Sequence, residues 1–129
     1  MDFALNVQQK RGYLHITVTG RNSAATVAAY LAQVVHECVT RDCRKVLVEE
    51  RLDGPRLGIS EIAELAAESS KEAMGTIQAL AYVDVNAEDD SMQFAELVAR
   101  NRLFPVRVFS SVSEAEVWIG GEKAKEQVH

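Results

Sequence analysis

The short apolar run Val46-Leu47-Val48 constrains the fold more than any other stretch of the sequence. It lies between the charged pairs Arg44-Lys45 and Glu49-Glu50. Three consecutive apolar side chains must therefore be buried by other parts of the fold. A strand of this kind is buried on both faces, as are the parallel strands of layered α/β folds. We therefore predict a central strand over residues 45–48, a polar loop over 49–57 and an amphipathic helix from about Gly58.

The rest of the chain supplies the layers that such a strand needs. Residues 3–7 and 13–19 alternate apolar and polar side chains around Gly12, which predicts an antiparallel hairpin. Apolar residues then recur at helical spacing from 27 to 39, after a cap at Asn22 or Ser23. Two further strands are expected at 77–83 and 106–109. Three further helices are expected: one from about Gly58 to Ser70, one from a cap at Asp90 or Ser91 to Asn101-Arg102, and one from the S-x-x-E capping box of Ser111 and Glu114 to Gly120-Gly121.

The predicted order is β-β-α-β-α-β-α-β-α. It indicates an α/β fold with a mixed, mostly parallel five-stranded sheet and four main helices. The first strand should run antiparallel at an edge. We expect a single domain over residues 1–121 and a polar C-terminal tail over 122–129.

Charge and composition exclude some classes of function. The formal net charge of the 129 residues is -5, and the basic residues are scattered, whereas nucleic-acid binders carry a basic stripe. No apolar run approaches the roughly 20 residues of a membrane span. The start, Met1-Asp2-Phe3, lacks the basic and apolar regions of a signal peptide. With two cysteines and no secretory signal, we expect a cytoplasmic protein without a transmembrane segment.

The loop after the central strand is the first candidate site. In open α/β sheets, ligands and partners meet the loops beyond the carboxyl ends of the strands, here 49–57, 84–90 and Ser110-Ser111. This predicts a recognition loop that contains Glu49, Glu50, Asp53, Gly54, Arg56 and Ser60.

Tests for catalytic chemistry give no clear set of residues. The acids Glu49, Glu50, Asp53 and Asp84 are candidates to gather at the strand ends as a hydrolase would need, or else they cap helices and contact water. No nucleophile stands beside a base, and no phosphate-binding glycine motif is present. We expect no catalytic residues and no cofactor.

A metal site is not expected either. The spacing of His36, Cys38 and Cys43 puts the first two on different sides of a helix, and a structural zinc wants a fourth ligand. We expect Cys38 in the core and His36 on the surface.

Five apolar side chains fall outside the strictest inward stripes. They are candidates for a groove that holds an apolar ligand or partner, although scattered surface apolar residues are normal. These residues are Tyr30, Leu65, Met74, Leu97 and Phe104.

Three segments near the C-terminus match a known pattern. They are Phe94-Ala95-Glu96-Leu97-Val98-Ala99-Arg100-Asn101-Arg102, Val106-Arg107-Val108-Phe109 and Glu114-Ala115-Glu116-Val117-Trp118. An F-x-E-x-x-x-x-N-R helix, a V-R-V-F strand and an E-A-x-x-W helix occur in this order in the SpoIIAA-like group of small bacterial proteins. The chain resembles this group and, in layout over about residues 2 to 119, the STAS fold of anti-sigma-factor antagonists.

The resemblance also implies functions that the composition alone does not indicate. STAS antagonists carry a phosphorylatable serine after an aspartate, roughly D-S-S-G-L, where this chain has Asp53-Gly54-Pro55-Arg56-Leu57. The serine position is Gly54. Ser60 is then either a phosphosite, if the loop is aligned differently, or a helix cap.

The resemblance leaves two expected functions. The first is a non-enzymatic regulatory or protein-interaction domain that acts through this loop and the following helix. The group also resembles CRAL-TRIO lipid carriers in fold. The alternative is therefore a carrier or sensor of a small lipid-like apolar ligand, with membrane contact. A homodimer through an edge strand or through residues 13–19 is also open.

Overall fold

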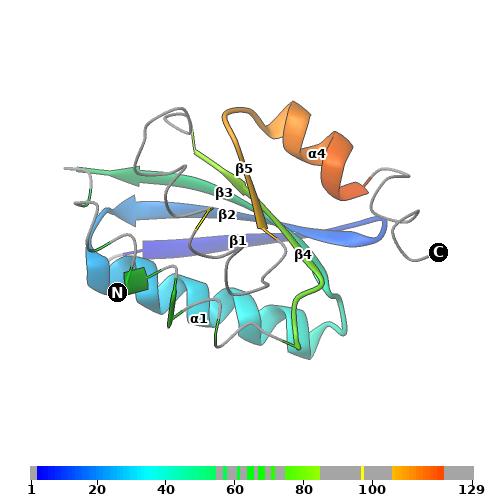
Figure 1. Cartoon of the computed structure of the whole chain (residues 1–129), viewed down its shortest axis with the longest axis horizontal. Coiled ribbons are helices and arrows are strands. Elements are labelled where there is room, and N and C mark those ends of the chain that lie inside the picture. The colour runs from blue at the N-terminus through cyan, green and yellow to red at the C-terminus, as the bar shows by residue number, and fades with distance from the viewer. Residues whose placement is uncertain are drawn as a thin grey trace.

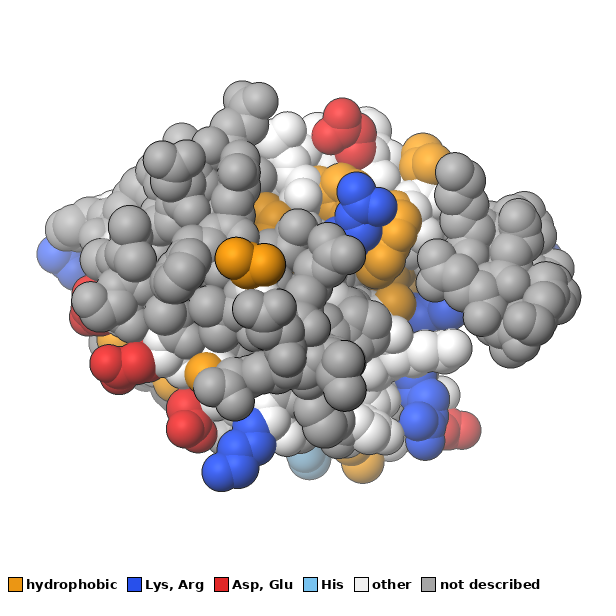
Figure 2. Space-filling model, viewed as in Figure 1, with side chains coloured by type: hydrophobic (Ala, Val, Ile, Leu, Met, Phe, Trp, Pro, Cys, Tyr) orange, Lys and Arg blue, Asp and Glu red, His pale blue; other side chains and the backbone are white. Residues whose placement is uncertain are grey.

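The computed structural model describes residues 3–54, 57, 61, 64–65, 67–68, 71, 75–84, 97 and 106–120. These residues form a five-stranded sheet with a helix on each face (Figure 1), and Figure 2 shows their atoms in white and colour. The elements are β1 (Phe3–Lys10), β2 (Tyr13–Arg21), α1 (Ala24–Thr40), β3 (Lys45–Asp53), β4 (Ala79–Val83), β5 (Val106–Phe109) and α4 (Val112–Gly120).

The strands lie in the sheet in the same order as in the sequence, β1-β2-β3-β4-β5. The β1–β2 pair is antiparallel, and the three other pairs are parallel. The predicted mixed, mostly parallel sheet with an antiparallel edge strand is confirmed. The fold class is α/β.

The first two strands form the expected hairpin. Lys10 pairs with Tyr13, and Gly12 between them has φ 85°, which is a left-handed conformation that glycine adopts without a side-chain clash. The helix that follows is capped by Ser23, whose side chain accepts a hydrogen bond from the backbone N–H of Thr26 at 3.1 Å. The prediction of a cap at Asn22 or Ser23 is confirmed for Ser23.

The central strand separates two apolar clusters, as its sequence predicts. Val46 and Val48 point to the α1 side and Leu47 to the α4 side, and all three side chains are fully buried. The cluster under α1 is the larger one and includes Leu14, Ile16, Val18, Tyr30, Val34 and Cys38. The cluster under α4 includes Tyr13, Ala79, Ala81, Ala115 and Ile119.

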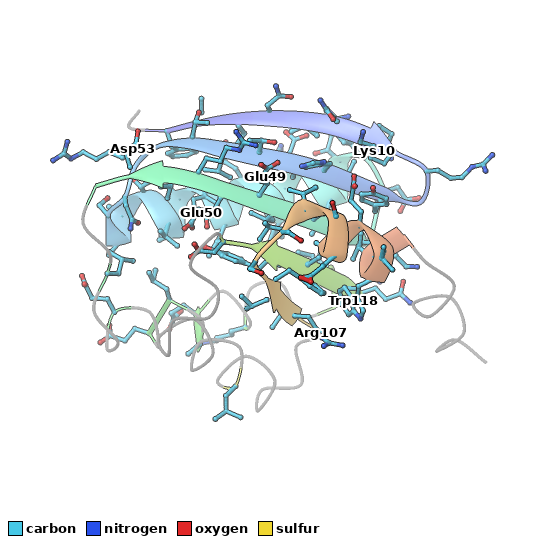
Figure 3. The ribbon with its side chains drawn as sticks, turned by 90° about the horizontal axis from the view of Figure 1, so that it is seen from above. Lys10, Glu49, Glu50, Asp53, Arg107 and Trp118 are labelled. Carbon is cyan, nitrogen blue, oxygen red and sulfur yellow. The ribbon has the colours of Figure 1, made fainter. Side chains whose placement is uncertain are left out.

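The α4 helix covers only part of its face of the sheet. It packs on β3, β4 and β5 and reaches Tyr13 at the start of β2, whereas no described helix covers the same face of β1 and of the rest of β2 (Figure 3). At its start, Ser111 Oγ accepts a hydrogen bond from the backbone N–H of Glu114 at 3.3 Å, as the S-x-x-E pattern predicts.

Two of the four predicted helices, at residues 58–70 and about 91–102, fall largely outside the described residues. Within the described part, Glu61, Glu64, Leu65, Ala67, Glu68 and Leu97 have helical conformation. The three glutamates are exposed, as the helical pattern predicts. Leu65 packs on the α1-side cluster, whereas the sequence pattern placed it outside the inward stripe. The predicted tail over 122–129 also lies outside the described residues. Among the helices that are described, none is long and apolar enough to cross a membrane.

Candidate functional site

The C-terminal half of β3 leaves the core and becomes solvent-exposed. The strand runs to Asp53, so the prediction that a loop begins at Glu49 is wrong: Glu49 and Glu50 belong to the strand. Polar side chains alone do not distinguish a loop from a strand that continues along its neighbour. Here β2 supplies the continued pairing, from Leu14↔Val46 to Arg21↔Asp53.

The sheet is narrower at this end, because β4 stops first. The last β3–β4 pair is Glu49↔Val83, so β2 and β3 continue for four more residues of β3. Arg21, Arg51, Asp53 and Gly54 are exposed there and are called the strand-end surface below. It lies at the carboxyl ends of two parallel strands, which is the edge where α/β sheets meet their ligands.

The end of β3 is held against the start of α1. The backbone N–H of Asn22 donates to the carbonyl oxygen of Asp53 at 2.6 Å. Gly54 follows with φ 107°, a conformation that strains any residue with a Cβ atom. Gly54 therefore has a backbone reason to be glycine.

Glu49 faces the α4 side of the sheet, where it joins β2 to β3. Its Oε1 lies 2.9 Å from Nε2 of His15 and 3.5 Å from the Thr17 hydroxyl. Its Oε2 accepts from Arg51 Nε at 2.5 Å. Glu49 and His15 are mostly buried, whereas the side chain of Arg51 is 66% exposed. The arrangement is an ion pair whose carboxylate is enclosed and whose cation reaches solvent.

These contacts decide the charge state of Glu49. Burial alone raises the pKa of its carboxyl group, but the hydrogen bonds with His15 and Arg51 and the electrostatic effects of these two residues outweigh burial, so the pKa is lowered. Glu49 is therefore a carboxylate at neutral pH. The Nδ1 atom of His15 is buried and has no hydrogen-bond partner among the described residues, so this ring nitrogen is not accessible to solvent.

Glu50 faces the opposite, α1 side, and lies among tyrosines. The hydroxyl groups of Tyr30 on α1 and Tyr82 on β4 both contact its Oε2 within hydrogen-bond distance, and the two hydroxyl oxygens are 2.8 Å apart. Burial raises the pKa of both tyrosines well above the ordinary 10.0, and the nearby Glu50 raises it further. The cluster links α1, β3 and β4 on the α1 side of the sheet.

The structure separates the four acids that were candidates to gather at the strand ends. Glu49 and Glu50 lie on opposite faces, and Asp53 lies exposed at the strand end, so these acids do not form a pair. Asp84 is buried after β4, and its backbone N–H donates to Phe109 O at 3.0 Å. Two further recognition-loop residues, Arg56 and the candidate phosphosite Ser60, lie outside the described residues.

The predicted apolar groove is not assembled by the residues that can be placed. Tyr30 is fully buried in the α1-side cluster, so its assignment to a surface groove is wrong. It belongs to the buried stripe of α1, and its hydroxyl contacts Glu50 inside the protein. Leu65 packs on that same cluster and Leu97 is 54% exposed. Met74 and Phe104 lie outside the described residues.

The candidate metal ligands lie as the helix pattern predicts. Cys38 is buried, and burial, with smaller effects of Cys43 and Glu37, raises the pKa of its thiol to about 12. His36 is exposed on α1 and lies 3.4 Å from the Thr40 hydroxyl. Across the described ranges, no group of three or more His, Cys, Asp or Glu side chains could hold a metal ion.

The sequence pattern shows on which face of the sheet a side chain lies, but not which side chain of another element it contacts. The alternation of side chains in β2 places His15 and Ile16 on opposite faces of the sheet. The sequence around His15 does not show, however, that Glu49 lies beside it. Tyr82 carried no signal beyond its place in an apolar strand. The parallel register His15↔Leu47 and Thr17↔Glu49 creates the site, and register is a tertiary property.

No protein-family model matches the sequence, and no curated protein matches it either.

Proposed function

We propose that this chain is a non-enzymatic regulatory or protein-interaction domain, of the kind that its resemblance to STAS and SpoIIAA-like proteins implies. Its recognition surface is the strand-end surface, Arg21, Arg51, Asp53 and Gly54, together with the segment that follows β3. Its partner is another protein.

One observation carries the proposal: β2 and β3 project beyond β4 and end in exposed charges of both signs. Arg21, Arg51 and Asp53 are all exposed, although the same strands are fully buried a few residues earlier. Mixed charges on a rigid strand end give specificity and orientation to a protein contact, because each needs its complement on the partner.

The state of the two carboxylates supports the non-enzymatic part of the proposal. General acid/base chemistry with two acids needs them on either side of one substrate. Glu49 and Glu50 point away from each other, and each is engaged by side chains of the protein itself, His15 with Arg51 and Tyr30 with Tyr82. Arg51 and Asp53 at the strand end are the exposed charged residues of β3.

The test compares two double variants that change the charge equally. Arg21→Ala with Asp53→Ala removes one positive and one negative group from the strand-end surface. Glu37→Ala with Arg41→Ala removes a 2.8 Å ion pair on α1 and serves as the matched control. Affinity-tagged wild type and both variants are used to capture proteins from a lysate of the source cells, and the captured proteins are identified and re-bound as purified proteins.

The proposal predicts that a purified partner binds wild type and the α1 control equally, and binds the strand-end variant at least tenfold more weakly, which corresponds to about 1.4 kcal/mol. Equal binding by both variants would remove the strand-end surface from the account. Circular dichroism confirms that each variant is folded.

A further inference from the structure

The outer edge of β1 is the least protected part of the described sheet. β1 pairs with β2 over eight consecutive residues, from Phe3↔Gly20 to Lys10↔Tyr13, without a bulge. In an antiparallel pair, alternate residues direct their N–H and C=O groups away from the partner strand. No described element lies beyond β1 (Figure 3).

The sequence of β1 lacks the devices that normally block such an edge. Proteins prevent edge-to-edge pairing with charged residues, proline or bulges. Residues 3–9 contain neither a charged side chain nor a proline, and the first charge is Lys10 at the end of the strand. This edge is therefore competent to pair with another strand.

The side chains of β1 also leave apolar surface at the edge. Phe3, Leu5 and Val7 point to the α1 side and pack against the core, but each remains partly exposed. Ala4, Asn6 and Gln8 point to the open face and are exposed. An added strand would cover the first set and extend the sheet without burying a charge.

We propose that β1 pairs with β1 of a second copy of this chain, antiparallel about a two-fold axis at Asn6. The two sheets then join into one continuous sheet of ten strands. This register uses all of residues 3–9 and keeps the faces matched. Leu5 lies opposite Val7 of the partner subunit, and Ala4 lies opposite Gln8 of the partner subunit.

Charge selects this antiparallel arrangement over a parallel one. In a parallel in-register pair the two Lys10 side chains would lie side by side, which is unfavourable for like charges. With the axis at Asn6 they lie eight residues apart along the strands, about 27 Å. That separation exceeds the screening length of about 8–10 Å in physiological salt.

The first test measures mass in solution with charge variants at the axis. Asn6→Lys and Asn6→Glu each put like charges opposite each other, and Thr19→Lys adds the same charge to the same face on β2, away from the edge. Light scattering is expected to give twice the chain mass for wild type and Thr19→Lys, the chain mass for each Asn6 variant alone, and twice the chain mass again for their equimolar mixture.

The second test uses the two-fold axis directly. Opposite side chains in antiparallel strands have Cβ atoms about 4.5–5.5 Å apart, close to disulfide geometry. Asn6→Cys is expected to form a covalent dimer under mild oxidation, whereas Gln8→Cys, four residues from its own copy, is not. The wild-type protein, which contains Cys38 and Cys43, is the control for cross-links through these two native cysteines.

A wild-type protein that is monomeric at about 0.1 mM, a range that detects even weak association, would overturn the proposal. So would equal cross-linking of the two cysteine variants, or an Asn6→Lys variant that remains a dimer. The proposed function does not depend on this interface, because the variants at Arg21 and Asp53 leave the residues of β1 unchanged.

Discussion

Glu49 and Glu50 are neighbours in β3, yet they lie on opposite faces of the sheet and serve different contacts. Glu49 accepts hydrogen bonds from His15 and Arg51 on the α4 side, and Glu50 meets the hydroxyls of Tyr30 and Tyr82 on the α1 side. Alternation along a strand makes this separation unavoidable. Both carboxylates therefore hold the fold together, and each contact can be tested.

The tyrosine cluster is expected to contribute measurably to stability. Tyr30→Phe removes a hydroxyl that contacts Glu50 from a fully buried position. Hydrogen bonds to charged groups contribute about 1.5–3 kcal/mol, so we expect a loss of that size in the free energy of unfolding in urea. Tyr13→Phe is the matched control, because its hydroxyl donates to Glu116 at 3.4 Å near the surface. We expect it to cost less than about 1 kcal/mol, and equal losses for the two variants would contradict the account.

The same cluster predicts a loss of stability in alkali. Burial first, and then the neighbouring Glu50, raise the pKa of Tyr30 and Tyr82 well above 10.0, so the native state keeps these protons after the unfolded chain has released them. Stability is then full below pH 10.0 and falls as the pH rises above it. Thermal unfolding between about pH 9 and pH 11 measures the slope, which Tyr82→Phe should make shallower. An unchanged slope in that variant would exclude the cluster as its source.

Glu49 predicts the opposite dependence, on the acid side. Although burial raises its pKa, His15 and Arg51 lower it below the ordinary 4.5, so its contribution is present above pH 4.5 and is lost as the pH falls through the lowered value. Glu49→Gln should cost about 1–3 kcal/mol at neutral pH, and the difference from wild type should shrink in acid. Glu37→Gln, which affects only a surface ion pair with Arg41, should cost less than about 0.5 kcal/mol. A Glu49→Gln difference that is constant with pH would contradict the lowered pKa.

The sequence predicts the framework of this fold because its framework signals are local. Val46-Leu47-Val48 is buried on both faces, Ser23 caps α1 and Gly12 closes the hairpin, all as the pattern indicates. The prediction of a loop at the polar residues of β3 is wrong because their strand conformation depends on pairing with β2. Paired contacts such as His15 with Glu49 are more than 30 residues apart in the sequence. Tyr30 belongs to the buried stripe of α1, but its contact with Glu50 on another element is not visible in the sequence of the helix.

The central strand offers a direct test of the two-faced core. Leu47→Ala removes a fully buried side chain from the cluster under α4 and should cost about 2–5 kcal/mol in the free energy of unfolding. Leu97→Ala makes the same chemical change at a side chain that is 54% exposed, and should cost less than about 0.5 kcal/mol. A large loss for Leu97 would instead indicate that this residue is part of a packed surface.

The central claim, that a protein partner docks on the strand-end surface, is tested most directly by photo-cross-linking. A photoreactive residue is placed at Arg21, on that surface, or at Val117, which is 75% exposed on α4. We predict a single cross-linked partner from position 21 and none from position 117. Cross-linking of the same partner from position 117, with none from position 21, would contradict the account.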